Sequence, residues 1–283
     1  MRISCSSLFL WNYHTNEIIE ILSRAGIDSI EFWPETPEFW MHRHEPDAIK
    51  QLKETISALT DHCTVHVPIL DLNASSYNEH VCKATIMETL WAIDLSSILE
   101  ASVLTIHPGH RTVHRAPTPM DWDRFYHYLS VCIKHANQVG VTLALENMSR
   151  NIRSMCYDTA GMSEVLLKFP DLMVTLDIAH ALYSGKDTAM KFIDELGDRI
   201  IHVHSGDIHN KIPHYPLYLY NNPDIITILG KLTGIGYNND LTIEIDDKLL
   251  GGYQSRQDKT SVLINEKEHL KKLLYNNSKI SKY

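Results

Sequence analysis

Six side chains that can bind a divalent cation stand near the ends of six short, apolar, β-branched segments. The segments read TVHVP, VLTIHPG, VTLALEN, LMVTLD, RIIHVH and LTIEID. The six residues are His66, His107, Glu146, Asp177, His204 and Glu244. A purely structural role could explain any one of these residues. It does not readily explain why six of them occupy the same position in successive segments. The pattern therefore predicts an enzyme with a metal centre.

The donor atoms of these residues divide into two overlapping sets. One set is rich in oxygen, has a single imidazole and suits Mn²⁺, Mg²⁺, Co²⁺, Fe²⁺ or Zn²⁺. It consists of Glu146, Asp177, His204 and Glu244. In the second set, His66 and His107 add two nitrogens, and Glu146 could bridge to a second metal ion a few ångströms away. We therefore expect one or two divalent metal ions per chain as the cofactor.

Eight strand-like segments alternate with helical patterns along the chain, and they must position these residues. We expect strands at Ile3–Leu8, Ser29–Trp33, Thr64–Val67, Val103–His107, Thr142–Glu146, Leu172–Asp177, Ile200–His204 and Leu241–Glu244. We expect helices at about Thr15–Ala25, Pro46–Leu59, Glu79–Glu100, Trp122–Val139, Thr159–Phe169, Thr188–Leu196, Asp224–Leu232 and Ser261–Leu274. Alternation of this kind implies parallel strands joined by helical crossovers.

The spacing of the six residues favours a closed barrel over an open doubly wound sheet. Successive residues lie roughly 25–40 positions apart, the length of one strand plus one helix in a barrel of about 250 residues. An open sheet would place its site in one crevice, whereas here polar residues end nearly every strand. The chain also lacks the glycine-rich motifs of nucleotide-binding folds. We expect a single (β/α)8 TIM-barrel domain over residues 1–283, with the site at the C-terminal ends of the strands.

Composition narrows the class of protein. Among 283 residues, 35 acidic against 26 basic side chains give a net charge of −9, which disfavours a general nucleic-acid-binding protein. No apolar run approaches the length of a membrane span. The five cysteines are scattered and include no C-x-x-C pair, as in proteins of a reducing compartment. We expect a cytoplasmic enzyme with a small-molecule substrate, and the sequence leaves the oligomeric state open.

The segments that carry the six residues resemble those of the xylose isomerase-like TIM barrels (AP endonuclease family 2). This superfamily is shared by endonuclease IV and many sugar and sugar phosphate isomerases and epimerases. The matching strings are His66-Val-Pro, His107-Pro-Gly-His110, Leu145-Glu146-Asn147, Leu176-Asp177-Ile-Ala-His180, His202-Val-His204-Ser-Gly-Asp207 and Ile243-Glu244. They extend from about residue 64 to residue 245, in an order and spacing that are fairly specific for the superfamily.

The resemblance implies a role for each residue of the oxygen-rich set. Glu146, Asp177, His204 and Glu244 match the single-metal quartet of the epimerase branch. In that branch the two glutamates also exchange the substrate proton. Glu146 and Glu244 are therefore the implied catalytic residues.

The other histidines match the metal ligands of endonuclease IV. His66 and His107 match its additional zinc ligands, and His180 and His214 match two ligands of its third zinc ion. The remaining ligand of that third ion is an aspartate two positions before the loop histidine, where this chain has Ile212. We therefore expect an incomplete third site, with His180 and His214 as additional metal or substrate ligands.

Several loop residues are candidates for substrate binding, because they could stack on a sugar face or bind a phosphate or carboxylate. They are Trp33, His110, Arg111, Arg150, Arg153 and Lys211. His202 alternates with His204 and is expected to face a helix as a buried core histidine. Asp207 is expected to orient His204.

Two enzyme classes fit this site. The first is a divalent-metal-dependent isomerase or epimerase of a small sugar, sugar phosphate or related polyhydroxy carbonyl compound. In it, Glu146 and Glu244 would move a carbon-bound proton by way of an enediolate. The alternative is an endonuclease IV-like zinc phosphodiesterase, acting on abasic-site DNA or a smaller phosphoester through a bridged metal pair.

The ligand list and the loops favour different classes. Two extra histidines are not needed for enolisation, which favours the phosphodiesterase. The loop Glu31–Glu38 is acidic where a phosphate-tracking surface would carry Arg or Lys, and Ile212 removes a ligand of the phosphate-binding metal. We therefore take the isomerase or epimerase as the main hypothesis and expect weak or absent nicking of DNA.

Overall fold

Eight parallel strands close into a barrel among the residues that the structure describes. The structure is a computed structural model that describes residues 1–251 and 254–280, the last four of these (277–280) by their backbone alone. Around the barrel the strands run in the order β1-β10-β7-β6-β5-β4-β3-β2, and every neighbouring pair is parallel. The expected (β/α)8 TIM barrel is confirmed. The expectation of one domain over residues 1–283 includes positions 252–253 and 281–283, outside the described residues, and stays a prediction.

The barrel strands overlap the segments expected from the sequence. They are β1 (Arg2–Ser6), β2 (Ser29–Phe32), β3 (Cys63–His66), β4 (Leu104–Ile106), β5 (Leu143–Glu146), β6 (Met173–Asp177), β7 (Ile200–Ser205) and β10 (Asp240–Ile243). The first strand ends earlier than expected, because η1 (Ser7–Leu10) forms a 3-10 turn. The Ser6 hydroxyl accepts a hydrogen bond from the Leu8 N–H and so caps this turn.

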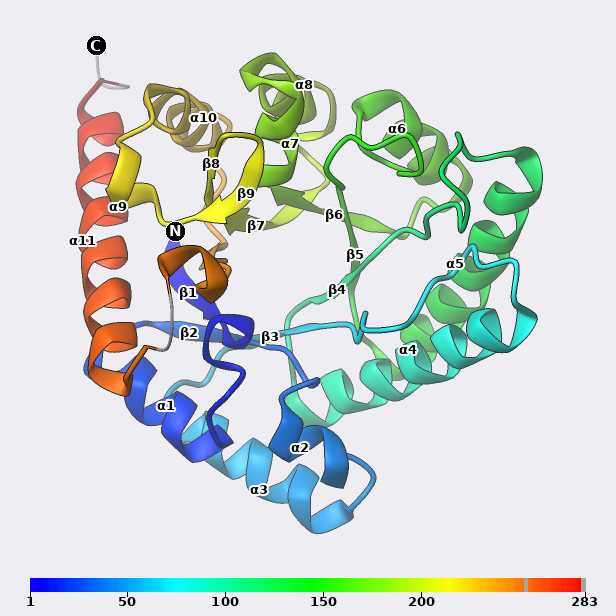
Figure 1. Ribbon diagram of the computed structural model, residues 1–283, viewed down its shortest axis with the longest axis horizontal. Coiled ribbons are helices and arrows are strands. Elements are labelled where there is room, and N and C mark those ends of the chain that lie inside the picture. The colour runs from blue at the N-terminus through cyan, green and yellow to red at the C-terminus, as the bar shows by residue number, and fades with distance from the viewer. Residues whose placement is uncertain (252–253, 281–283) are drawn as a thin grey trace.

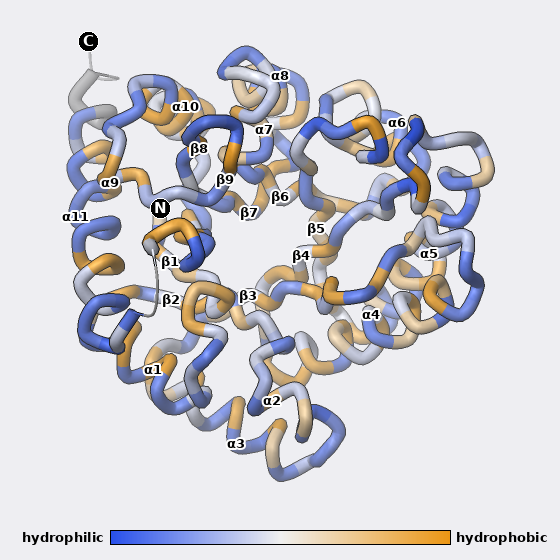
Figure 2. The backbone as a smooth tube through the Cα atoms, viewed as in Figure 1, coloured by the Kyte–Doolittle hydropathy of each residue, from blue (hydrophilic) through white to orange (hydrophobic). Residues whose placement is uncertain are grey.

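The outer ring of helices follows the chain order around the barrel (Figure 1). Its members are α1 (Thr15–Arg24), α3 (Pro46–Ser57), α4 (Glu79–Leu99), α5 (Pro119–Val139), α6 (Thr159–Lys168), α8 (Lys186–Leu196), α10 (Pro223–Gly234) and α11 (Arg256–Ile280). Prolines open α3, α5 and α10, where a missing N–H does no harm. Hydrophobic and hydrophilic positions alternate along these helices (Figure 2), as in helices that bury one face.

The structure contains further elements in stretches where the sequence analysis expected loops. They are α2 (Pro37–His42), α7 (Ile178–Ser184), α9 (Leu217–Tyr220), η2 (Asp247–Leu250) and a hairpin of β8 (Asp207–His209) and β9 (Ile212–Tyr215). Asn210 and Lys211 turn this hairpin with φ angles of 51° and 65°. A two-residue hairpin turn of type I′ has positive φ at both positions and is signalled by Asn-Gly or Asp-Gly. Asn-Lys is a weaker signal, which explains why the hairpin was not expected.

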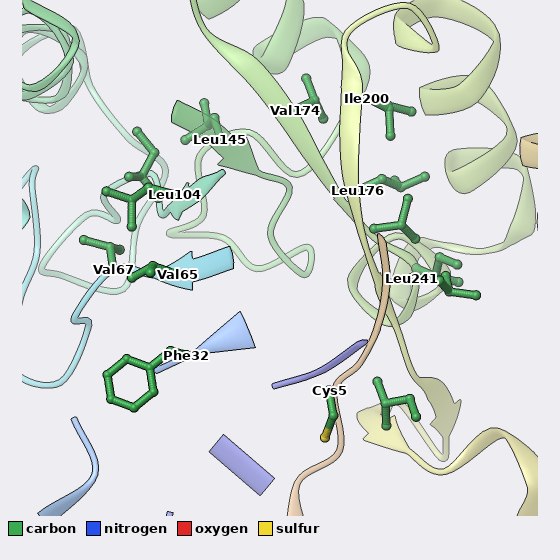
Figure 3. Close-up of a cluster of buried hydrophobic side chains, with 14 of the residues drawn as sticks. Cys5, Phe32, Val65, Val67, Leu104, Leu145, Val174, Leu176, Ile200 and Leu241 are labelled. Carbon is green, nitrogen blue, oxygen red and sulfur yellow. The ribbon is translucent and has the colours of Figure 1, made fainter. Parts of the chain in front are cut away.

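The two faces of the barrel strands have different characters. Figure 3 shows apolar side chains from successive strands, such as Val65, Leu145 and Leu241, gathered in the buried cluster. Polar side chains of the same strands meet inside the barrel. There Thr105 of β4 donates a hydrogen bond to Glu31 of β2, although β3 lies between these strands. A strand alternates its side chains between two faces, so this arrangement aims the polar strand ends into the mouth of the barrel.

The helices and the cysteines can be compared with the expectations from composition. Within the described ranges, no helix combines the length and apolar character needed to cross a membrane. All five cysteines are free thiols.

Candidate active site and metal centre

The six strand-end residues meet at the C-terminal mouth of the barrel, in groups whose ligand atoms all lie within 4.8 Å of one another. The central group is Glu146, Asp177, His204 and Glu244, and the flanking groups are His66, His107 and Glu146 on one side and Asp177, His180 and His214 on the other. Glu146 and Asp177 each belong to two groups. The three groups therefore form one continuous cluster, as the spacing of the strand ends indicated.

The central group surrounds the inner nitrogen of His204. His204 Nδ1 lies 2.8 Å from Glu244 Oε2, 3.6 Å from Glu146 Oε1 and 3.9 Å from Asp177 Oδ2. All four residues are buried, with exposed fractions between 0% and 8%. These residues lie at, or one position from, the C-terminal ends of β5, β6, β7 and β10, which are neighbours in the barrel.

The donor atoms of the central group fit a divalent cation. Glu146 Oε1, Asp177 Oδ2, His204 Nδ1 and Glu244 Oε2 make no well-directed hydrogen bond within the described part of the chain, although imidazole nitrogens lie within ion-pair distance of the carboxylates. Leaving a buried polar atom unpaired costs about 1–3 kcal/mol, more for a charged group, so four such atoms facing one another call for a shared partner. Three oxygens and one nitrogen suit Mn²⁺, Mg²⁺, Co²⁺, Fe²⁺ or Zn²⁺.

The first flanking group adds two imidazoles to Glu146. His107 Nε2 lies 2.9 Å from Glu146 Oε2 and 3.1 Å from His66 Nε2, and His66 Nε2 lies 3.5 Å from the same carboxylate oxygen. The other ring nitrogen of His66, Nδ1, lies 2.8 Å from the carbonyl oxygen of Val67 and donates to it. That bond orients the His66 ring so that Nε2 faces Glu146, as a backbone contact does for a metal-ligating histidine.

The second flanking group is more complete than the sequence indicated. Ile212, which stands where the third aspartate was expected, is 45% exposed in β9 and supplies no ligand. Asp177 supplies a carboxylate to this group instead. His180 of α7 and His214 of β9 meet with their Nε2 atoms 3.1 Å apart. Both histidines come from the two elements that the sequence analysis did not expect, the short helix and the hairpin.

The imidazoles keep the two candidate catalytic carboxylates ionised. Burial alone would raise the pKa of Glu146, but His107 and His204 beside it hold that pKa well below its usual value. Burial also opposes the ionisation of Glu244, yet His204 and His214 lower its pKa to about 2. Both glutamates are therefore carboxylates at neutral pH, in the state that can accept a proton.

Asp177 and His204 hold protons that a bound cation would displace. Burial, together with Glu244 and Glu146, raises the pKa of Asp177 well above its usual value. Burial opposes the charged form of His204, but Glu31, Glu244 and Glu146 raise its pKa well above its usual value. Metal ligands must be deprotonated, so binding of a cation here is coupled to proton release.

Glu31 is the residue of this site that the sequence analysis misplaced. It was expected in an acidic, substrate-facing loop, but it is fully buried inside the barrel. Its Oε1 lies 3.1 Å from His204 Nε2 and 3.2 Å from His202 Nε2. The alternation of β2, with Ile30 and Phe32 in the core and Glu31 between them, is the signal that could have placed it inside.

His202 and Asp207 also differ from expectation. Residues two apart on a strand share a face, so His202 points into the barrel with His204 rather than toward a helix. It is buried, as expected, and its Nε2 lies 3.2 Å from the Thr242 hydroxyl. Asp207 accepts hydrogen bonds from the Ile208 N–H and the Asn222 side chain. It begins β8, beyond the bend after β7, and these bonds do not involve His204.

The acidic loop after β2 does not present its charges to the barrel mouth. Glu35 is buried and accepts hydrogen bonds from the N–H groups of Ile69 and Leu70, both at 2.8 Å. Glu38 lies in the first turn of α2, and its Oε1 is 3.7 Å from His14 Nδ1. These carboxylates do not line the catalytic cavity, and the expectation of weak or absent nicking of DNA stays a prediction.

Two adjoining cavities open at the barrel mouth. The first, of about 310 Å³, contains Glu146, Glu244 and Trp33. The second, of about 360 Å³, is lined by His110 and Arg153. Three of the six candidates for substrate binding therefore line these cavities.

The other three candidates make contacts elsewhere. Arg111 donates hydrogen bonds to the carbonyl oxygen of Ala116 and the hydroxyl of Tyr77. Lys211 donates to the carbonyl oxygen of Tyr183. The guanidinium of Arg150 lies 5.8 Å from the centre of the Tyr157 ring. Loop contacts hold Arg111 and Lys211 in place, so neither lines the two cavities, and Arg150 is absent from both linings as well.

The chain is similar in sequence and in structure to known proteins. The family model described as xylose isomerase-like TIM barrel matches residues 19–272. The uncharacterized protein MJ1188 of Methanocaldococcus jannaschii is 33% identical over 276 residues, covering 97% of this chain and 100% of that protein. Fructoselysine 3-epimerase of Escherichia coli O157:H7 is 26% identical, covering 79% and 82%. The crystal structure of a D-tagatose 3-epimerase-like protein gives a TM-score of 0.81 at 26% identity, covering 99% and 100%.

Proposed function

The chain belongs to the xylose isomerase-like TIM barrel family, and from that premise we propose that it is a divalent-metal-dependent epimerase or isomerase. Its substrate is a small sugar, a sugar phosphate or a related polyhydroxy carbonyl compound, and the reaction passes through an enediolate. The relatives named as fructoselysine 3-epimerase and D-tagatose 3-epimerase-like protein support this class.

One observation carries the proposal: four buried ligand atoms lie within 4.8 Å of one another, and two of them belong to glutamates. Glu146 ends β5 and Glu244 follows β10, with β6 and β7 between these strands in the barrel. The two carboxylates therefore approach the cavity from different directions. An epimerase needs this arrangement, because the proton must leave one face of the substrate and return to the other.

The residues of the site have different roles in the proposed reaction. One of the two glutamates, ionised at neutral pH, removes the proton from the carbon beside the carbonyl, and the other returns a proton from the opposite side. A cation held by Glu146, Asp177, His204 and Glu244 would supply Lewis-acid polarisation of the carbonyl and the adjacent hydroxyl. Trp33, which is 4% exposed, closes one wall of the cavity and reduces the access of water.

The proposal is tested by metal removal and restoration. Protein purified without chelator or nickel resin is analysed for metal, treated with chelator, and reloaded with Mn²⁺, Co²⁺, Fe²⁺, Mg²⁺ or Zn²⁺ in separate samples. We expect conversion of at least one ketose in a panel to its epimer or aldose isomer, lost with the metal and restored by reloading. Turnover that persists at full rate without metal, or a reloaded enzyme that converts none of the sugars, would count against the proposal.

The two pairs of extra histidines favour a second candidate, an endonuclease IV-like phosphodiesterase. His66 with His107, and His180 with His214, could each hold a further metal ion next to the central one. Metal ions spaced in this way can activate water and stabilise a leaving oxygen. Incubation of the metal-loaded protein with a duplex that contains an abasic site tests this candidate. Efficient nicking at physiological salt, abolished by His107→Ala, would favour it over the epimerase.

A further inference from the structure

The second cavity opens beside the proposed catalytic cavity and shares part of its lining. Ile69, His107, Met148 and His180 belong to both linings. The second cavity extends from His107 toward the loops that follow β3, β4 and β5. The two cavities measure about 310 Å³ and 360 Å³, so a molecule that occupies both is larger than one that fills the catalytic cavity alone.

The two cavities differ in charge. Glu146, Glu244, Asp246 and Asp247 give the catalytic cavity carboxylates. No residue of the second lining within the described chain carries a carboxylate, and the members with a basic side chain are His107, His110, Arg153 and His180. Charge at the barrel mouth therefore changes from acidic above β10 to basic beside β4 and β5.

Polar atoms in the second lining are buried without a partner. Arg153 Nε and the Ser149 hydroxyl are buried and make no hydrogen bond within the described part of the chain. Arg153 also forms no ion pair with a described residue, in contrast to Arg111 in the neighbouring loop, which lies 3.9 Å from Asp121. Partial burial and the charge of Arg153 lower the pKa of His110, as expected where no anion balances the guanidinium.

The loops around this cavity are joined to one another before any ligand binds. The Asn73 side chain donates to the carbonyl oxygen of His110 and accepts from its N–H, which links the loops after β3 and β4. The Arg111 N–H donates to the carbonyl oxygen of Arg153 at 3.1 Å, which links the loops after β4 and β5. These hydrogen bonds fix the backbone that carries Arg153. Binding of a ligand therefore costs little conformational entropy of the loops.

We propose that the second cavity is a subsite for an anionic substituent of the substrate, a phosphate ester or a carboxylate on a carbon distant from the reacting ones. Arg153 binds the anion through its guanidinium, and the Ser149 hydroxyl donates a further hydrogen bond. The substrate then spans both cavities, with its carbonyl end at the glutamates. This inference rests on the proposed function, because it names the class of sugar that the same site accepts.

The test compares three sugars that differ only at carbon 6: D-fructose, D-fructose 6-phosphate and D-fructuronate. We expect kcat/KM of the metal-loaded enzyme to be roughly 10- to 100-fold higher for a charged sugar than for D-fructose, the range of a charge-assisted hydrogen-bond pair. The phosphate and carboxylate arms identify which anion the subsite prefers. Arg153→Met should remove most of the preference, and Arg153→Lys should restore part of it, because lysine keeps the charge but not the planar fork.

The control is Arg115→Met, which removes the same charge from an exposed position in the loop after β4 and should leave the preference intact. Equal kcat/KM for the three sugars, or equal losses in Arg153→Met and Arg115→Met, would overturn the subsite while the epimerase proposal stands.

If no sugar is converted, the proposed function fails and the subsite is judged by binding alone. Inorganic phosphate is then titrated calorimetrically into chelator-treated protein. Phosphate binding that is weakened by Arg153→Met but not by Arg115→Met supports the subsite, and absent or unchanged binding overturns it.

Discussion

At the residue scale, Glu31 illustrates how a buried charge could position a candidate metal ligand. Its carboxylate lies 3.1 Å from the outer nitrogen of His204, while the inner nitrogen of His204 faces the central group. A hydrogen bond of this kind fixes the ring orientation and the tautomer of a ligating histidine. We therefore infer that Glu31 is a positioning residue that acts through His204.

Replacing Glu31 should therefore weaken metal binding without removing a ligand. We expect Glu31→Gln to lower the affinity for the divalent cation roughly 10- to 100-fold, measured by competition with a chromophoric chelator. Asp240→Asn is a matched control, because Asp240 is also buried and also contacts a histidine, His62 at 2.6 Å, at the start of β10. Equal affinities of Glu31→Gln and the unmodified protein would show that Glu31 does not orient His204.

Single residues also show what the sequence could and could not predict. The six strand-end candidate ligands could be identified because each stands at the end of an apolar run, and the folded strands keep this position at the mouth of the barrel. His202 was misplaced because residues two apart on a strand were assigned to opposite faces, although they share one face. Ser149 gave no signal, because its importance depends on a cavity between loops that no local pattern describes.

At the scale of elements, the loops after β3 and β4 pack so closely that Gly109 leaves no room for a side chain. A Cβ on Gly109 would lie 2.6 Å from the Ser75 backbone nitrogen. We expect Gly109→Ala to destabilise the protein by about 1–3 kcal/mol, as overpacking does, measured by urea unfolding. Gly234→Ala in α10 is the control, because a Cβ there meets no atom within 4 Å. Similar unfolding free energies for the two variants would contradict the tight packing of these loops.

The barrel strands and the outer helices could be predicted, while the elements that supply His180 and His214 could not. Alternation and helical periodicity recur over many residues, which makes the eight units visible. The helix α7 spans only Ile178–Ser184, and tertiary contacts at the barrel mouth decide its form. The hairpin depends on positive φ at Asn210 and Lys211, residues that do not require it.

At the scale of the whole molecule, Glu266 of α11 ties the C-terminal helix to the segment that follows the hairpin. It accepts hydrogen bonds from the N–H groups of Leu217 and Tyr218 at the start of α9. Burial raises the pKa of Glu266 to about 7, despite these two bonds. The folded state therefore holds this proton at a pH where the unfolded chain has lost it.

Glu266 should make stability fall as pH rises. Its favourable contribution is complete below about pH 4.5, the value for an unperturbed glutamate, and is lost as pH rises to about 7. The unfolding free energy of the protein, minus that of Glu266→Gln, should fall by up to about 3 kcal/mol across this window and be constant above it. Glu268→Gln, which removes an exposed carboxylate from the same helix, should show no such trend. A flat difference for Glu266→Gln would contradict the raised pKa.

We propose above all that Glu146 and Glu244 move a carbon-bound proton of a sugar with a divalent metal in place. Solvent deuterium tests it most directly. The metal-loaded enzyme is incubated in D₂O with each ketose of the panel, and the sugars are analysed by proton NMR and mass spectrometry. Because the returned proton comes from a second glutamate that exchanges with solvent, the product should carry one deuterium on the carbon beside the carbonyl. Glu146→Gln and Glu244→Gln should abolish this labelling. Product that forms without deuterium, or unlabelled sugars together with efficient nicking of an abasic duplex, would contradict the account.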